Sequence, residues 1–158
     1  MLRLPARLRL RIFAASPRRE VSLPETDARR VASIIHAALT LGVIAFAVVA
    51  GVLHEASPTP YVSEGLPALR LVAIGLAAGG FAAVNLLRQR VSVPPAGSGA
   101  AEWQATMGRA VVVWAVAEAT ALTGTVLWLV TRDALVLLPL LVGLVLLAWF
   151  RPSVLLAP

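Results

Sequence analysis

The chain has 158 residues, of which 59% are hydrophobic and 14% are charged, whereas a soluble globular domain carries about a quarter charged residues. Lipid is therefore the expected solvent for most of the chain, with room for one compact bundle and little else. The absence of cysteine excludes a disulfide framework, a thiolate metal site and a cysteine nucleophile, and two histidines are too few for a conventional metal site.

The formal net charge of +6 comes from arginine, because all 14 basic residues are Arg. Such a charge can indicate a nucleic-acid surface, but here the arginines lie beside apolar segments rather than in one basic patch. We therefore expect the lipid bilayer and other integral membrane subunits as partners. Neither nucleic acid nor a soluble small-molecule substrate is expected.

Residues 1–30 form a basic arm, and residues 31–158 are expected to form the membrane domain. Near the start of the arm, basic and apolar residues alternate in RLRLRIF. The pattern predicts either a segment on the membrane surface, with its arginines on anionic headgroups, or a solvated cytoplasmic arm that sets topology. The arginines assigned to the membrane surface are Arg3, Arg7, Arg9 and Arg11.

The first expected membrane span is 31–53. It holds small residues four positions apart, which share one face of a helix and allow a neighbouring helix to approach closely. These pairs are Ala38 with Gly42 and Ala47 with Gly51.

The second expected span is 67–87. Gly75, Gly79 and Ala83 follow one another at four-residue steps and predict a helix-packing ridge. We favour packing of this ridge inside the chain over packing between two copies of the chain.

A flexible, Pro- and Gly-rich linker is expected over 91–107, followed by a third span over 108–130 with Glu118 near its middle. At about 1.5 Å per residue this third segment reaches about 34 Å, enough to cross a hydrocarbon core of about 30 Å. A short fourth span, 134–150, follows a tight turn, and Pro139 should kink it or loosen its first turns. Together the segments predict an all-α, polytopic four-transmembrane-helix bundle.

The arginines are distributed unequally between the two sides of the expected bundle. They gather in the arm, in the connection 88–109 and after the last span, and only Arg70 and Arg132 fall on the other side. By the positive-inside rule both termini are expected in the cytoplasm. The expected location is the bacterial inner membrane.

Glu118 is the main functional candidate, because an ionisable group at the bilayer midplane costs at least about 2.5 kcal/mol and normally faces protein or water. One interpretation is a carboxylate that exchanges protons or ions, with Thr40 at comparable depth as a second ligand. The other is a protonated carboxyl that holds two helices together by a hydrogen bond, with Thr40 as one partner. The sequence leaves both open.

The segment 73–130 resembles the hairpin of ATP synthase subunit c. A small-residue helix, AIGLAAGGFAAVNLL, leads to Arg88-Gln89, which is similar to the polar-loop Arg-Gln of that family. The next helix carries AEATALTGTVLWLV, similar to the family's segment around its ion-binding carboxylate. The resemblance implies that Glu118 is that carboxylate and that Arg88 and Gln89 form the loop that meets the central stalk. The long Pro-rich loop and the two additional spans depart from the family's pattern.

His36 follows Ala32 by one helical turn, which resembles the A-x-x-x-H pigment site of purple bacterial light-harvesting helices. The resemblance implies that the imidazole binds the magnesium of a chlorin. The alternative, which we favour, is a packed or interfacial histidine without a cofactor.

These observations predict a small non-enzymatic subunit that packs into and stabilises a larger, energy-transducing membrane complex. The first alternative is a subunit-c-like proteolipid that translocates protons or ions through Glu118. A further alternative is a pigment-binding subunit that uses His36. No cofactor is expected under the favoured interpretation.

Overall fold

The computed structural model describes residues 25–56, 65–95 and 97–157, and the regular structure in these ranges is entirely helical. Three helices are long: α1 (Glu25–Ala56), α2 (Leu66–Arg88) and α3 (Ala100–Thr131). A 3₁₀ helix, η1 (Ala134–Leu137), leads into α4 (Leu138–Trp149), and a short α5 (Pro152–Leu155) follows. The surface arginines predicted at positions 3–11 lie outside the described residues.

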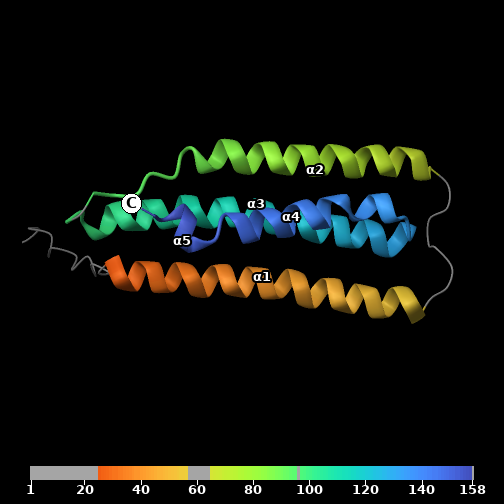
Figure 1. Cartoon of the computed structure of the whole chain (residues 1–158), viewed down its shortest axis with the longest axis horizontal. Helices are drawn as coiled ribbons and strands as arrows, with labels where there is room; N and C mark the ends of the chain where they lie inside the picture. Colours follow the sequence, from red (N-terminus) through yellow and green to blue (C-terminus); the bar gives the residue numbers. More distant parts are fainter. Residues whose placement is uncertain (1–24, 57–64, 96, 158) are drawn as a thin grey trace, which may run out of the picture.

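The helices α1, α2 and α3 are each long and apolar enough to cross a membrane, which indicates an integral membrane protein. They contain the three longer spans expected from the sequence. The shorter apolar segment formed by η1 and α4 runs beside them (Figure 1).

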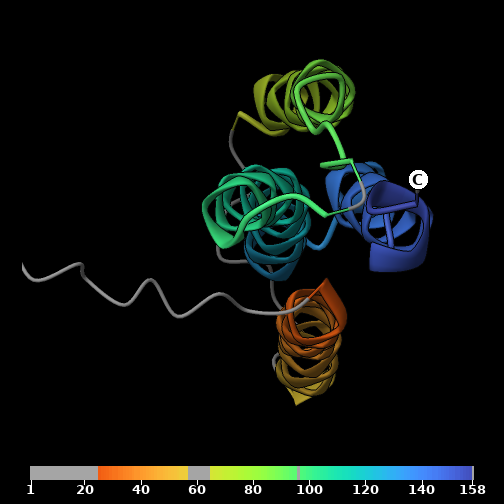
Figure 2. The same ribbon diagram turned by 90° about the vertical axis from the view of Figure 1, so that its left-hand side faces the viewer.

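The helices lie side by side, with α3 and α4 between the other two (Figure 1). The end-on view shows α1 and α2 on opposite sides of this central pair (Figure 2). The start of α1, the end of α2, the start of α3 and the end of α4 all lie at one end of the molecule. Six of the arginines in the described ranges belong to this end, which we call the basic end: Arg29, Arg30, Arg88, Arg90, Arg109 and Arg151.

The helix α3 is the centre of the fold. In its most apolar window 44% of the residues are buried, against 11% in α1 and 17% in α2. Its buried positions follow three- and four-residue steps and include Val113, Trp114, Ala117 and Ala121. Most of the surface of α1 and α2 therefore faces outward, as expected where lipid or another subunit is the neighbour.

Glycine allows α3 and α4 to approach at the level of the backbone. A Cβ atom at Gly143 would lie 2.6 Å from the carbonyl oxygen of Ala117 and 2.7 Å from the side chain of Ala121. Gly124 meets the backbone of Leu140 in the same way. No side chain fits at either position without moving a backbone, so these glycines set the spacing of the central pair.

The helix α2 packs through a face that differs from the predicted ridge. Its buried residues are Ala73, Ala77, Gly80 and Val84, and Gly80 lies against the side chain of Thr120. Gly75 and Gly79 are exposed, and a Cβ atom at either would meet nothing within 4 Å among the described residues. The expected packing of this ridge inside the chain is therefore not found. A contact of Gly75, Gly79 and Ala83 with another chain stays a prediction.

The small residues of α1 differ in their surroundings. Cβ atoms built at Gly42 and Gly51 would lie 3.9 Å from the Oε1 atom of Glu118 and 4.0 Å from Trp128, so both glycines face α3. Ala47 is partly buried against the core, whereas Ala38 is exposed. The predicted pairs therefore lie only in part on the face that packs against α3.

The helix α3 begins at Ala100, inside the segment expected to be a linker. The acidic Glu102 lies in its first turn, where it complements the helix dipole. Two contacts hold this first part in place: the Thr106 hydroxyl donates to the Ser92 carbonyl at 2.9 Å, and the Arg29 guanidinium lies 5.8 Å from the ring centre of Trp103. At about 48 Å, α3 is longer than a hydrocarbon core, so its polar start extends beyond one.

The predicted tight turn before the last apolar segment is present. Arg132 adopts a left-handed conformation with φ 58°, and the Asp133 side chain accepts a hydrogen bond from the Leu135 N–H. The segment then starts as the 3₁₀ helix η1, and α-helix begins only at Leu138, with Pro139 in its first turn. Proline lacks the N–H that a helix interior needs, which agrees with the loosened first turns predicted from the sequence.

Gly143→Ala tests the close approach of α3 and α4. We expect a loss of about 1–3 kcal/mol of stability, seen as a lower thermal midpoint in detergent, because the new methyl group meets backbone atoms. Gly75→Ala is the matched control, since it adds the same methyl group to another apolar helix at an open position. Equal midpoints for the two variants would contradict the described spacing.

Candidate functional site

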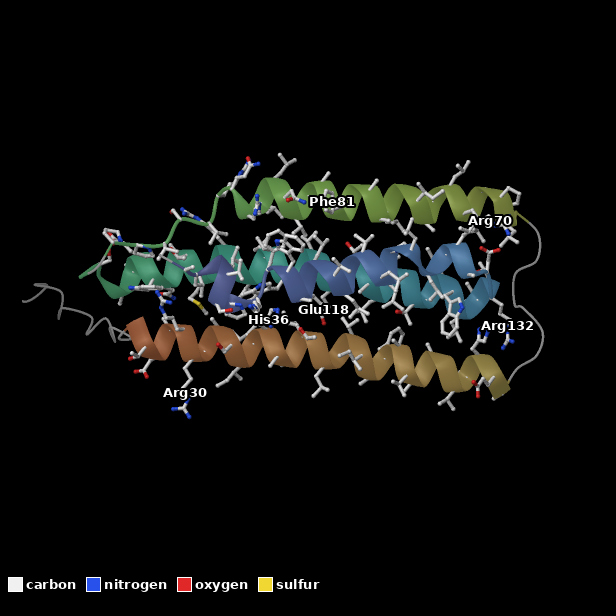
Figure 3. The ribbon with its side chains drawn as sticks, in the orientation of Figure 1. Arg30, His36, Arg70, Phe81, Glu118 and Arg132 are labelled. Atoms are coloured by element: carbon white, nitrogen blue, oxygen red, sulfur yellow. The ribbon has the colours of Figure 1, made fainter. Side chains whose placement is uncertain are left out.

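Glu118 lies in the middle part of α3, and its side chain is half-buried. Its carboxylate points toward α1 at Gly42, where a Cβ atom would lie 3.9 Å from Oε1. Figure 3 shows Glu118 and His36 in the space between α1 and the central pair of helices. The absence of a side chain at Gly42 leaves room for the carboxylate at this contact.

The carboxylate of Glu118 has no hydrogen bond or ion pair within residues 25–56, 65–95 and 97–157. The predicted bond from Thr40 is not formed, because the Thr40 hydroxyl donates to the carbonyl of His36 in its own helix at 2.9 Å. A role for Thr40 in ion binding stays a prediction. Glu118 is thus an acidic group in an apolar segment with no protein partner in the described part of the chain.

His36 is bonded to the last turn of α4. Its Nε2 atom lies 2.9 Å from the carbonyl oxygen of Leu147, and because a carbonyl only accepts, Nε2 carries the hydrogen. The ring also meets Trp114 edge-on, with centroids 5.2 Å apart. Ala32, which would have to leave room for a chlorin, is fully buried. In this structure the residues around His36 do not fit a chlorin, since Nε2 already donates to Leu147 and Ala32 is fully buried.

Trp114 is a buried polar residue whose role at the site was not predicted from the sequence. It is 0% exposed, and its Nε1–H donates to the Phe150 carbonyl at 2.6 Å. Carbonyl groups in the last turn of a helix have no partner within that helix, so His36 and Trp114 satisfy two of them at the end of α4. A tryptophan among the apolar residues of a predicted span, on the same helical face as Glu118, was the available signal.

A second polar cluster lies at the end of the molecule opposite the basic end (Figure 3). Arg70 of α2 donates from Nε to Asp133 at 3.1 Å and pairs with the same carboxylate through Nη2. Arg132 donates to the backbone carbonyl of His54, and the His54 ring stacks on Trp128 with centroids 4.3 Å apart. These contacts join α1, α2 and the turn after α3. The hydrogen bond from Arg70 holds the pKa of Asp133 below its ordinary value.

No group of three or more His, Cys, Asp or Glu side chains that could hold a metal ion occurs in the described ranges. The polar groups there serve mainly to satisfy backbone carbonyls, as do the hydroxyls of Thr120, Thr123 and Thr125, which donate four residues back along α3.

Searches for relatives found no matching family model, no matching curated protein and no matching solved structure. The resemblance of residues 73–130 to the subunit c hairpin therefore stays a prediction.

The Arg70–Asp133 pair makes stability depend on pH. Folding lowers the pKa of the Asp133 carboxyl below its unfolded value, which is about 3.9 for Asp. Such a group stabilises the fold at pH values above the unfolded pKa. This contribution is lost as the pH falls through the lower pKa of the folded state. At neutral pH we expect the thermal midpoint of the wild type to be higher than that of Asp133→Asn. The difference between the two midpoints should shrink as the pH falls below about 4. Asp27→Asn, an exposed change at the basic end, is the control. A difference that stays constant from neutral to acidic pH would contradict the role of the ion pair.

Proposed function

We propose that this protein is a small, non-catalytic integral membrane subunit that packs into a larger membrane complex and stabilises it. The observation that carries the proposal is a groove of about 540 Å³ between α2 and α3, whose small lining residues include Gly75, Gly79 and Ala83. Glycine and alanine allow two helix backbones to approach within a membrane, where van der Waals packing drives association. Here that surface is open, because nothing in the described chain lies against Gly75 or Gly79.

The exposure of the outer helices supports the same proposal. Most apolar residues of α1 and α2 face away from the central pair, and the connections between the helices are too short to form a catalytic domain. The resemblance of residues 73–130 to subunit c is what points to an energy-transducing complex.

We further propose a four-span bundle in the bacterial inner membrane, with both termini in the cytoplasm. The segment formed by η1 and α4 would be the fourth crossing, with Asp133 at one end and Arg151 at the other. It runs about 26 Å, and local thinning of the bilayer accommodates such a mismatch at modest cost. The six arginines at the basic end, against Arg70 and Arg132 at the other, support this orientation.

Reporter fusions test the orientation. Fusions after residue 60 should report the outside of the cell and fusions after residue 97 the inside, because the basic end should stay in the cytoplasm. The reverse pattern would refute the proposed topology.

The subunit role is tested by Gly75→Ile combined with Gly79→Ile. Because these positions are open in the single chain, we expect the thermal midpoint of the purified protein to stay within about 2 °C of wild type, as for surface changes. Recovery of partner subunits by mild-detergent pulldown from the native membrane should fall at least about tenfold, since bulky side chains prevent close helix approach.

Leu71→Ile is the matched control on the exposed side of α2, outside the groove. Wild-type protein that is recovered without partner subunits, or a double variant that retains them, would refute the subunit role.

A second candidate function, exchange of protons or ions by Glu118, is favoured by one observation. A structural carboxyl that holds two helices together should be hydrogen-bonded, yet Glu118 has no such partner in the described part of the chain. The carboxylate instead faces α1 beside Gly42. A group so placed is free to bind a proton or cation in turn.

Glu118→Gln separates the two candidates, because glutamine keeps the shape of the side chain but does not titrate. If Glu118 exchanges protons, the variant should assemble normally and lose proton uptake into vesicles that contain the purified complex. Glu102→Gln, an exposed change in the first turn of the same helix, is the control and should have no effect. Unchanged uptake in Glu118→Gln would exclude the exchange function and leave the subunit role.

A further inference from the structure

A groove in the described chain combines apolar walls with a cation that has no hydrogen-bond partner there. It lies between α2 and α4 toward the basic end, has a volume of about 280 Å³, and is lined by residues that include Phe81, Asn85 and Arg88 of α2 and Val145 and Trp149 of α4. The larger grooves between α1 and α3 and between α2 and α3, of about 480 and 540 Å³, have no charged residue among those that line them. A groove of about 350 Å³ contains Arg109, but Glu102 also lines it, and Arg109 already donates to the carbonyl of Arg90.

The cation of this groove is Arg88, which is held by an aromatic ring and has N–H groups free to bind an anion. The guanidinium carbon of Arg88 lies 5.4 Å from the ring centre of Phe150, a cation–π contact that restrains the long side chain. Arg88 is exposed, and its N–H groups have no hydrogen-bond partner within the described ranges. A guanidinium in this state presents paired donors that match the oxygens of a phosphate.

The apolar walls continue from this cation toward the middle of the bundle. Arg88 and Trp149 are the last residues of α2 and α4, the positions at which arginine and tryptophan meet the headgroup region. Phe81 lies two turns, or about 10 Å, deeper along α2, in the half of that helix near the basic end (Figure 3). The side chains of Phe81, Val145 and Trp149 are 56%, 58% and 67% exposed. The groove thus runs from headgroup depth into the depth of the acyl chains.

We propose that the groove between α2 and α4 binds an anionic phospholipid. The phosphate pairs with the guanidinium of Arg88, and one acyl chain lies along Phe81 and Val145. The charge of Arg88 selects an anionic lipid, since basic pockets between membrane helices bind anionic headgroups. The apolar walls select a lipid rather than a free phosphate ion. This site is independent of the proposed subunit role, because the groove opens on a different side of α2 from the Gly75–Gly79 surface.

Trp149 provides the probe for the test. The full chain is reconstituted in phosphatidylcholine vesicles with a small fraction of phosphatidylglycerol, and either lipid carries brominated acyl chains that quench tryptophan on contact. Trp103 and Trp114 are 5% and 0% exposed and contribute little, and any quenching of the half-buried Trp128 remains in Trp149→Phe and is subtracted. The part of the quenching that disappears in Trp149→Phe reports the groove.

We expect wild type to prefer phosphatidylglycerol over phosphatidylcholine at Trp149 by about fivefold, the ratio that one arginine at a membrane surface provides. Arg88→Gln should abolish the preference, so that the ratio of quenching by the two lipids falls to about 1. Arg88→Lys should retain most of the preference. Arg90→Gln is the matched control, because it removes the same charge two residues away, outside the residues that line the groove. Native mass spectrometry of the detergent-extracted protein gives a second readout, the number of phosphatidylglycerol molecules retained.

Three results would overturn the proposal. Equal quenching by the two lipids in wild type would exclude a selective site. A full preference in Arg88→Gln would exclude the guanidinium as its cause. An equal loss in Arg88→Gln and Arg90→Gln would show that the general charge of the basic end, rather than this groove, attracts the lipid.

Discussion

The end of α4 depends on two side chains that belong to other helices. The carbonyl groups of Leu147 and Phe150 lie where a helix leaves its last carbonyls without internal partners, and in an apolar solvent such groups cost several kcal/mol each. His36 of α1 and Trp114 of α3 donate to them. These bonds require α1, α3 and α4 to meet at one level, and this requirement fixes the packing of three helices. The backbone contact at Gly143 sets the distance between α3 and α4 at which these hydrogen bonds form.

The same requirement makes Glu118 unusual. Around it, polar groups are satisfied locally: Thr40, Thr120 and Thr125 each donate to a carbonyl four residues earlier in their own helix. Glu118 cannot do this in its ionised form, because a carboxylate only accepts. A group that is costly in lipid and has no partner in the described chain can meet either a partner from another subunit or an exchangeable ion. A subunit role and an exchange role differ in which of these applies.

Much of the fold could be predicted from the sequence, because length and hydropathy alone determine which segments can span a membrane. The expected segments 31–53, 67–87 and 108–130 lie within α1, α2 and α3, and the turn at Arg132 and the effect of Pro139 were also predicted. The face of α2 that packs against α3 could not be predicted from the sequence. Its sequence has two small-residue faces, one with Gly75 and Gly79 and one with Ala77 and Gly80, and only the tertiary fit to Thr120 decides between them.

The partners of the site residues were also beyond sequence reasoning, for a physical reason. Thr40 was expected to bond to Glu118 because the two lie at similar depth, but a threonine hydroxyl in a helix always has a backbone carbonyl within reach, and that local bond forms here. The bond from His36 to α4 joins residues 111 positions apart, which no local pattern indicates. The presence of polar residues in an apolar span could be read directly, whereas their partners depended on how the helices pack.

The two ends of the molecule differ in how their arginines are used. At one end Arg70 is neutralised by Asp133, and Arg132 is bonded to the carbonyl of His54, so both are bonded within the chain. At the basic end Arg109 donates to the carbonyl of Arg90, whereas Arg88 lies against the ring of Phe150 and its N–H groups have no hydrogen-bond partner in the described part of the chain. A membrane with anionic lipid in its cytoplasmic leaflet attracts the second kind of end and gains little from the first. The unpaired guanidinium of Arg88 therefore adds to the difference in the number of arginines, and both favour the proposed orientation of the chain.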